Sequence, residues 1–309
     1  MSLHPFIGAM LEQLADRPAL SAGTPEQARA MVAEGRAVLG AGVDMHQVRD
    51  VEVPARSGKV AARLLFPSET PDGLVVYVHG GGWVIGAPDD YEILGRALAA
   101  ESGCAVLIPD YRLAPEHPFP AGLEDCEDVL LWARDNIADI VGENASLIVA
   151  GDSAGANLAT IALRRNPRIA ADLQVLIYPV TDCDFSTRSY ELHGAGLTLT
   201  RADMKWFFEH YAPEAERAHP DISPLRARDL SGLPPAVVVL AEYDVLHDEG
   251  VAYAKRLRDE GSGATIRTIA GMTHGFIRLH NHVDLIRDEI ARIGTEIRAA
   301  AGLKMRRDA

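Results

Sequence analysis

The sequence predicts an α/β fold: a mostly parallel central sheet with helices on both faces and a helical cap. Short continuous apolar runs alternate with longer segments of helical spacing, which is the pattern of a parallel sheet and its covering helices. The runs are too short for helices and lack polar alternation, so they predict strands buried on both faces. These runs are residues 74–78, 105–108, 147–150, 173–178 and 236–241, followed by a last strand near 265–269.

The segments around these runs predict the remaining elements of the sheet and its cover. Two strand-like segments, 48–53 and 60–66, precede the first apolar run. The second of them alternates, which predicts a half-exposed antiparallel strand at the edge of the sheet. Covering helices are predicted where apolar residues recur at helical spacing, at 91–100, 122–136, 154–165, 249–260 and near 283–300.

Two regions fall outside this alternation. Residues 1 to about 45 are rich in alanine and predict two helices ahead of the main fold. Residues 183 to about 220 contain no buried-strand run, but Thr200 is placed to cap an apolar helix that includes Trp206 and Phe207. An insertion between two sheet strands must lie at the end of the sheet. We therefore expect this region to belong to a cap on a single domain spanning residues 1–309.

The composition argues against several classes of partner and site. The 309 residues are 48% hydrophobic, and the formal net charge of −14 argues against nucleic acid or an anionic membrane surface as a partner. Three cysteines without C-x-x-C spacing predict neither a disulfide framework nor a metal site. The N-terminus does not resemble a signal peptide, and no segment approaches the roughly 20 apolar residues that span a bilayer. These features predict a cytoplasmic protein without integral membrane association.

The sequence Gly-Asp-Ser-Ala-Gly at 151–155 is the first candidate site. It lies between an apolar run and a helical segment, where the pattern G-x-S-x-G builds a sharp strand-to-helix turn that exposes a serine hydroxyl. Small residues flank the serine because the backbone of this turn passes close to its neighbours. Taken alone, the pentapeptide fits an ordinary small-residue turn equally well. Ser153 is therefore a candidate nucleophile whose support must come from the rest of the chain.

A serine nucleophile needs a base and a carboxylate that orients the base. Where such turns stand on α/β sheets, the chain order is serine, acid, histidine. Asp244 comes directly after the run 236–241, and His274 follows the last predicted strand. Both positions are at the carboxyl ends of strands, where open α/β sheets carry their sites. Asp244 could instead be an ordinary helix-start carboxylate, and the rival acids nearby are Glu242 and Asp248.

The segment His79-Gly80-Gly81-Gly82-Trp83 directly follows the run 74–78. Acyl transfer develops negative charge on the carbonyl oxygen, which preorganised backbone N–H groups stabilise. Consecutive glycines can present such groups without hindrance from side chains, and loops of this type act together with the N–H after the nucleophile, here that of Ala154. A flexible turn is the alternative. It requires neither the histidine nor this position after a central strand.

Five motifs together resemble the hormone-sensitive-lipase-like family of α/β hydrolases, the bacterial carboxylesterases often called family IV. They are HGGGW at 79–83, DYRLAPE at 110–116, GDSAGANLA at 151–159, DVLHDEG at 244–250 and HGF at 274–276. The resemblance implies the α/β-hydrolase fold, with a cap built from the two leftover regions, 1–45 and 183–220. Departures are small: Ala156 and Val245 stand where many relatives have glycine and proline.

The resemblance also implies the role of each site residue. Ser153 is the nucleophile, His274 the general base and then acid, and Asp244 its orienting carboxylate. Arg112 and Glu116 hold loops near the site. The amides of Gly81, Gly82 and Ala154 form the oxyanion hole. His79 and Gly80 belong to the loop that shapes it.

The expected activity is hydrolysis of short- to medium-chain carboxylic esters through an acyl-enzyme on Ser153, with a small-molecule ester as partner and no cofactor. An amidase or acyltransferase would use the same residues. A non-catalytic receptor on the same fold is a further alternative, although such receptors lack a working triad histidine. A homodimer through an edge strand is expected by analogy only. The aromatic side chains expected to line the substrate pocket are Trp83, Trp206, Phe207 and Phe276.

Overall fold

The computed structural model describes residues 2–307, which are built around an eight-stranded sheet with the strand order β1-β2-β4-β3-β5-β6-β7-β8. Strands β3 to β8 are mutually parallel, and β1 and β2 are antiparallel. The strands are β1 (Gln47–Ala55), β2 (Gly58–Phe66), β3 (Gly73–Val78), β4 (Ala105–Pro109), β5 (Ser146–Asp152), β6 (Leu173–Ile177), β7 (Ala236–Tyr243) and β8 (Ala264–Thr273).

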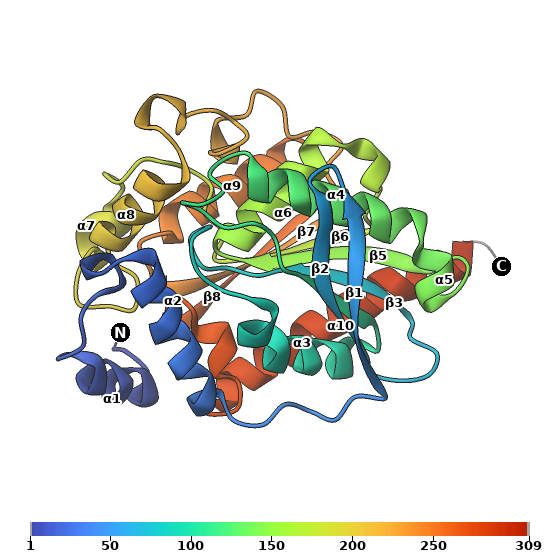
Figure 1. Ribbon diagram of the computed structural model, residues 1–309, viewed down its shortest axis with the longest axis horizontal. Helices are drawn as coiled ribbons and strands as arrows, with labels where there is room; N and C mark the ends of the chain where they lie inside the picture. The colour runs from blue at the N-terminus through green and yellow to red at the C-terminus, as the bar shows by residue number, and fades with distance from the viewer. Residues whose placement is uncertain (1, 308–309) are drawn as a thin grey trace.

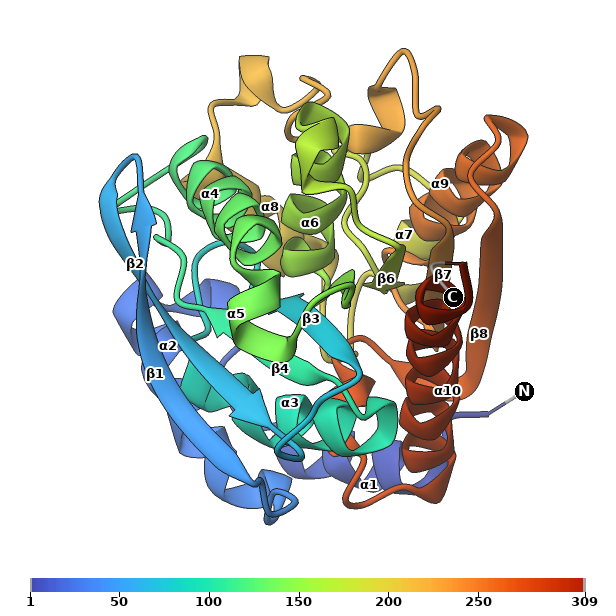
Figure 2. The ribbon, with the colours of Figure 1, turned by 90° about the vertical axis from the view of Figure 1, so that its right-hand side faces the viewer.

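Helices cover both faces of the sheet, as the sequence predicts. Figure 2 shows α4, α6 and α9 on one face and α3 and α10 on the other. Each face has its own buried apolar cluster, so the sheet is enclosed by two cores. The helices are α1 (Pro5–Leu14), α2 (Pro25–Glu34), α3 (Pro88–Ser102), α4 (Ala121–Asp135), α5 (Ile137–Val141), α6 (Ala154–Arg165), α7 (Arg188–His193), α8 (Arg201–Tyr211), α9 (His247–Asp259) and α10 (Asp284–Arg307).

The prediction that the strand at 60–66 lies at the edge of the sheet is wrong. Strand β2 lies between β1 and β4, with Val60 opposite Val53 and Ala62 opposite Pro109, and β1 forms the edge. Residues 64–66 of β2 are all buried, whereas most of β1 is exposed. The alternation in β2 comes only from its first half, where one face reaches solvent, so it does not mark the edge of the sheet.

The two regions outside the strand–helix alternation lie together. Figure 1 shows α1 and α2 near α7 and α8 at one end of the molecule, opposite α5, which directly precedes β5. Ser21 donates to Asp203 Oδ1 through both its backbone N–H, at 3.1 Å, and its hydroxyl, at 2.6 Å. Asp203 also completes a capping box with Thr200 at the start of α8. One buried carboxylate thus joins the N-terminal region to the insertion.

No helix within the described range 2–307 is long and apolar enough to cross a membrane.

Candidate active site

Ser153 occupies a strained turn between β5 and α6. Its φ of 53° and ψ of −120° place a side-chain-bearing residue in a region that L residues rarely adopt. The turn passes so close to the neighbouring strand that a Cβ on Gly155 would lie 2.0 Å from the carbonyl oxygen of Val78. A Cβ on Gly151 would lie 2.7 Å from the same oxygen. Both glycines of the motif are therefore required by this turn.

His274 lies between Ser153 and Asp244. Its Nε2 is 3.0 Å from the Ser153 Oγ, and its Nδ1 is 2.7 Å from the Asp244 Oδ2. Asp244 follows β7 directly, is 1% exposed and also accepts a hydrogen bond from the Leu246 N–H at 3.0 Å. These contacts form a hydrogen-bonded chain from carboxylate to imidazole to hydroxyl, the geometry that activates a serine.

The two rival acids have other partners. Glu242 accepts a hydrogen bond from the backbone N–H of Gly271 at 2.7 Å. Asp248 lies on α9 and accepts from the Ser189 N–H at 2.9 Å. The structure therefore brings Asp244, and neither Glu242 nor Asp248, into hydrogen-bond contact with His274.

The glycine loop after β3 is a tight, left-handed segment. Gly81, Gly82 and Trp83 have φ values of 115°, 58° and 62°. A Cβ on Gly81 would lie 2.0 Å from the carbonyl oxygen of Ile85, and one on Gly82 would lie 2.2 Å from the ring of Phe207. Across from this loop, Ala154 is the first residue of α6, so its N–H has no acceptor within the helix.

His79 is buried under this loop. Its ring lies between Tyr91, at 5.3 Å, and Tyr111, at 4.4 Å between ring centroids. Its Nδ1 is 2.8 Å from the carbonyl oxygen of Gly80, so this nitrogen carries the proton and donates it. Burial lowers the pKa of His79 to about 4, so the ring is neutral near pH 7. Its contacts tie it to the backbone and the tyrosines of this loop region.

Asp152 is a site residue that the sequence reasoning missed. Its Oδ1 accepts hydrogen bonds from the Gly80 N–H at 2.8 Å and from the Tyr77 hydroxyl at 2.9 Å. Burial raises the pKa of this carboxyl, and the two hydrogen bonds oppose that rise. The only signal in the sequence was an aspartate at the variable position before the serine, in an otherwise apolar setting. Its contacts join the serine turn to the glycine loop.

Known proteins resemble this chain in fold and in sequence. Residues 75–278 match the family model described as alpha/beta hydrolase fold. A carboxylic ester hydrolase of Mycobacterium tuberculosis is 40% identical over 245 residues, covering 75% of this chain and 65% of that relative's length. The chain belongs to the hormone-sensitive-lipase-like carboxylesterases. The enzyme is thus a carboxylic ester hydrolase, which contradicts the alternative of a non-catalytic receptor.

Two further proteins resemble this esterase over nearly their whole length. An ethyl acetate hydrolase of Pseudomonas putida is 35% identical over 302 residues, covering 92% of this chain and 95% of the relative. The solved structure of a hyperthermophilic esterase from the archaeon Pyrobaculum calidifontis superposes with a TM-score of 0.91 at 35% identity. It covers 97% of this chain and 99% of that one. The α/β-hydrolase fold predicted from the sequence is confirmed.

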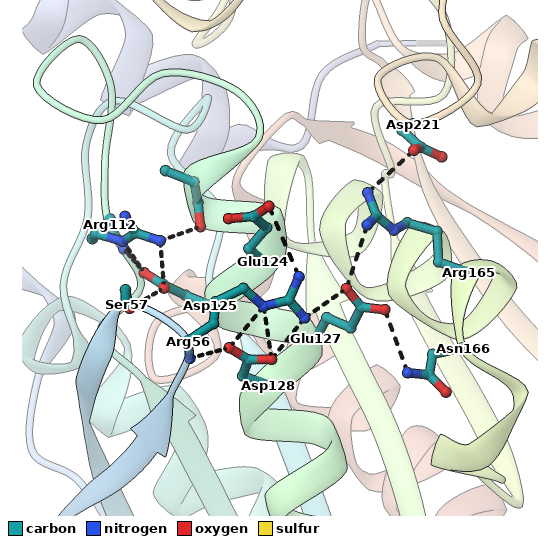
Figure 3. Close-up of polar contacts among 11 residues, drawn as sticks. Arg56, Ser57, Arg112, Glu124, Asp125, Glu127, Asp128, Arg165, Asn166 and Asp221 are labelled. Carbon is teal, nitrogen blue, oxygen red and sulfur yellow. Dashed lines mark hydrogen bonds and ion pairs between the residues drawn. The ribbon is translucent and has the colours of Figure 1, made fainter.

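Arg112 and Glu116 of the esterase both make ion pairs. Arg112 binds both carboxylate oxygens of Asp125 at 2.8 Å, and Ser57 from the β1–β2 turn donates to the same carboxylate. Figure 3 shows this pair beside a second group of polar contacts, in which Arg56 binds Glu127 of α4 and Glu127 binds Arg165 of α6. Glu116 pairs instead with Arg29 of α2, at 2.7 Å.

The four aromatic residues expected at the substrate pocket lie in different surroundings. Trp83 is 1% exposed and stacks on Tyr211 with centroids 4.2 Å apart. Phe276 is fully buried, 5.5 Å from the ring of Tyr178. Phe207 lies against Gly82, and Trp206 beside it on α8 is half-buried. Trp83 and Phe276 are thus packed in the interior, and of the α8 pair it is Phe207, 3% exposed, that contacts the glycine loop.

A cavity of about 200 Å³ lies beside His274. The hydroxyl of Thr198, on its wall, donates to the carbonyl oxygen of His274 at 2.7 Å. Sequence reasoning did not identify this cavity, because its apolar wall comes mostly from the N-terminal helical region. Its lining is Met10, Leu14, Val32, Gly35, Leu39, Thr198, His274, Gly275, Arg278 and Leu279.

Proposed function

We propose that this esterase is a serine carboxylesterase that hydrolyses short- to medium-chain carboxylic esters through an acyl-enzyme on Ser153. The observation that carries the proposal is the double contact of His274, 3.0 Å from the Ser153 Oγ and 2.7 Å from the Asp244 Oδ2. A histidine held in this way can take the hydroxyl proton while a buried carboxylate stabilises the imidazolium that forms.

The proposed reaction has two halves. Ser153 attacks the ester carbonyl as His274 Nε2 accepts its proton, and the resulting oxyanion is stabilised by the amides of Gly81, Gly82 and Ala154. The intermediate collapses as His274 returns the proton to the departing alcohol, which leaves the acyl group on Ser153. A water activated by His274 then hydrolyses the acyl-enzyme, releasing the acid and restoring the serine hydroxyl. These steps use side chains and backbone amides only.

The cavity beside His274 supports a small, largely apolar substrate. Its walls come mainly from aliphatic side chains, and its volume of about 200 Å³ suits a short chain better than a long lipid tail. The name of the ethyl acetate hydrolase relative is consistent with this size. We further propose that residues 1–45 and 183–220 form a cap over the site, and that Trp206 and Phe207, which lie outside the lining of this cavity, contact the substrate on the side of the glycine loop. Trp83 and Phe276 do not line this cavity and would support the substrate site by packing behind it.

Hydrolysis of p-nitrophenyl esters tests this proposal. Purified enzyme is expected to release p-nitrophenol from the acetate and butyrate esters, with the rate falling for long acyl chains. Ser153→Ala should lose at least about a thousandfold in kcat/KM. Ser57→Ala, which changes a serine of the β1–β2 turn that contacts Asp125, is the matched control and should retain activity near that of the unmodified enzyme. Undiminished turnover by Ser153→Ala would refute the assignment.

An amidase or an acyltransferase would use the same residues. The amidase differs in the bond that it cleaves, and the acyltransferase in the molecule that accepts the acyl group. A p-nitroanilide counterpart of the best ester measures amidase activity, and added alcohol measures acyl transfer. We expect ester hydrolysis to exceed both. A homodimer stays a prediction; β1 and β8 are the two edges of the sheet available for such pairing. Sedimentation measures this assembly independently of activity.

A further inference from the structure

Arg29 of α2 reaches the loop that carries the proposed oxyanion amides. Its Nε donates to the carbonyl oxygen of Val84 at 2.8 Å, and its Nη2 donates to that of Ala114 at 2.9 Å. The same guanidinium binds both carboxylate oxygens of Glu116 at 2.7 Å. One side chain from the N-terminal region is therefore bonded to two separate loops of the main fold.

The glycine loop needs support of this kind. Gly81, Gly82 and Trp83 all have positive φ, and Trp83 adopts that conformation with a large side chain. The loop pairs with its neighbour through the Ala114 N–H, which donates to the carbonyl oxygen of Trp83 at 2.9 Å. Arg29 bonds the next carbonyl on each side, those of Val84 and Ala114. Arg29 thus bridges the two segments next to the hydrogen bond between Ala114 and Trp83. This bridge opposes relaxation of the strained segment.

We propose that Arg29 is a positioning residue for the oxyanion loop: its bridge between the Val84 and Ala114 carbonyls holds the amides of Gly81 and Gly82 at the place where the tetrahedral intermediate forms. This inference rests on the proposed function of that loop. Helix α2 also lines the cavity beside His274 through Val32. The same helix therefore contacts both the cavity and the oxyanion loop.

The chemistry of arginine suits this role. Its planar guanidinium presents several donors in a fixed fork, so it can bridge two carbonyls and a carboxylate at once, which a lysine ammonium on a flexible stem cannot do. The Arg29 guanidinium lowers the pKa of Glu116 to about 2, so the ion pair persists throughout the pH range of an esterase assay. Glu116 in turn keeps the fork oriented toward the two carbonyls.

The test compares Arg29→Met, which keeps the aliphatic stem, with Arg29→Lys, which keeps the charge. Because loss of one oxyanion-hole donor lowers kcat by about 10²–10³, we expect displacement of the loop in Arg29→Met to cost about tenfold to a hundredfold in kcat. KM should change by less than about threefold, since ground-state binding is retained. Affinity for a boronic acid that forms a tetrahedral adduct on the serine should fall with kcat. The kcat of Arg29→Lys should lie between that of the parent enzyme and that of Arg29→Met.

Arg134→Met is the matched control. Arg134 of α4 also donates to two backbone carbonyls, those of Ile169 and Ala170, and pairs with Asp172 at 3.8 Å. None of these partners belongs to the glycine loop or its neighbour. A merely structural role predicts similar losses of melting temperature in both variants and no selective change in kcat. The inference requires kcat to fall in Arg29→Met and to stay within about twofold of the parent in Arg134→Met.

Two results would overturn the inference: a kcat equal to that of the parent in folded Arg29→Met, or an equal fall in kcat in Arg134→Met. If Arg29→Met does not fold, Arg29→Lys decides by the same kcat criterion. The Ser153→Ala variant separates this inference from the proposed function. Turnover by Ser153→Ala refutes the function itself, whereas an inactive Ser153→Ala beside a fully active Arg29→Met refutes only the role of Arg29.

Discussion

The carboxylate of Asp152 accepts a hydrogen bond from the backbone N–H of Gly80 at 2.8 Å, and this contact joins the two loops of the proposed oxyanion hole. Asp152 immediately precedes the nucleophile, and Gly80 immediately precedes the loop glycines. The approach is so close that a Cβ on Gly80 would lie 2.5 Å from the Asp152 Oδ2. One buried side chain therefore bonds the serine turn to the glycine loop, in addition to the pairing of β3 with β5 at Val78 and Gly151.

Substitution of Asp152 should uncouple these loops in a graded way. Asp152→Asn keeps an oxygen that can accept from both Gly80 and Tyr77, so we expect kcat to fall by less than about tenfold. Asp152→Ala leaves the Gly80 N–H and the Tyr77 hydroxyl without this acceptor, each costing about 1–3 kcal/mol of folding stability. Its kcat should fall further than that of Asp152→Asn. Esterase kinetics and urea unfolding measure both effects. Equal kcat in the two variants would show that the contact does not position the loops.

Substitution of the three neighbouring carboxylates tests which one serves His274. Asp244→Asn should lower kcat by about 10³–10⁴, since the amide no longer favours the required tautomer or stabilises the imidazolium; the magnitude is that known for the corresponding aspartate of the serine-protease triad. Glu242→Gln and Asp248→Asn are matched controls, because each changes an acid of the same segment that bonds backbone N–H groups elsewhere. Both should stay within about tenfold of the parent. A larger loss in either control than in Asp244→Asn would reassign the acid.

A methyl group on Gly82 should clash with the ring of Phe207. A Cβ there would lie 2.2 Å from the ring, and φ is 58°. Gly232 is the control for backbone strain, because its φ is 76° but a Cβ would meet nothing within 4 Å. We expect Gly232→Ala to cost about 1 kcal/mol of unfolding free energy and Gly82→Ala about 1–3 kcal/mol more.

Adding Phe207→Ala to Gly82→Ala removes the clash. The double variant should therefore be more stable than the sum of the two single effects predicts, by about 1–3 kcal/mol in a double-mutant cycle. Denaturant unfolding of the four proteins provides the measurement. Strict additivity would show that the loop moves away from α8 without strain.

The proximity of Ser153, Asp244 and His274 could be predicted from the sequence. Ser153 and Asp244 come directly after the buried strands β5 and β7, and His274 follows the edge strand β8. The carboxyl ends of parallel strands meet at one edge of a sheet. The alternation of apolar runs and helical segments was therefore enough to predict the fold and to gather these residues. Their catalytic roles stay proposals until the variants are assayed.

The contacts that Arg29 and Asp203 make with distant segments could not be predicted from the sequence. Arg29 meets Val84 across 55 positions, and Asp203 meets Ser21 across 182. An arginine on a helix or a capping aspartate fits many partners, so its sequence context does not select one. The edge strand was predicted wrongly for a related reason. Alternation reports how far one face is exposed, and it cannot say which neighbour covers the strand's hydrogen-bonding edge.

His79 should make the stability of the enzyme depend on pH. Burial lowers its pKa from 6.5 to about 4, so the folded state holds the neutral ring and takes up a proton only at lower pH than the unfolded chain does. Between these two pKa values the unfolded chain binds more protons. The unfolding free energy must therefore fall as the pH falls from about 6.5 to about 4, with a slope of at most about 1.4 kcal/mol per pH unit from this residue.

His79→Phe isolates this contribution, because it keeps an aromatic ring between Tyr91 and Tyr111 but cannot titrate. Urea unfolding of both proteins at a series of pH values gives two stability curves, and the contributions of all other groups cancel in their difference. Above pH 6.5 that difference should be constant; toward pH 4 it should shift by up to about 3 kcal/mol against the parent. A difference that stays flat across this window would mean that His79 binds its proton as readily in the folded state as in the unfolded chain. That result would contradict its burial between the two tyrosines and the Gly80 carbonyl.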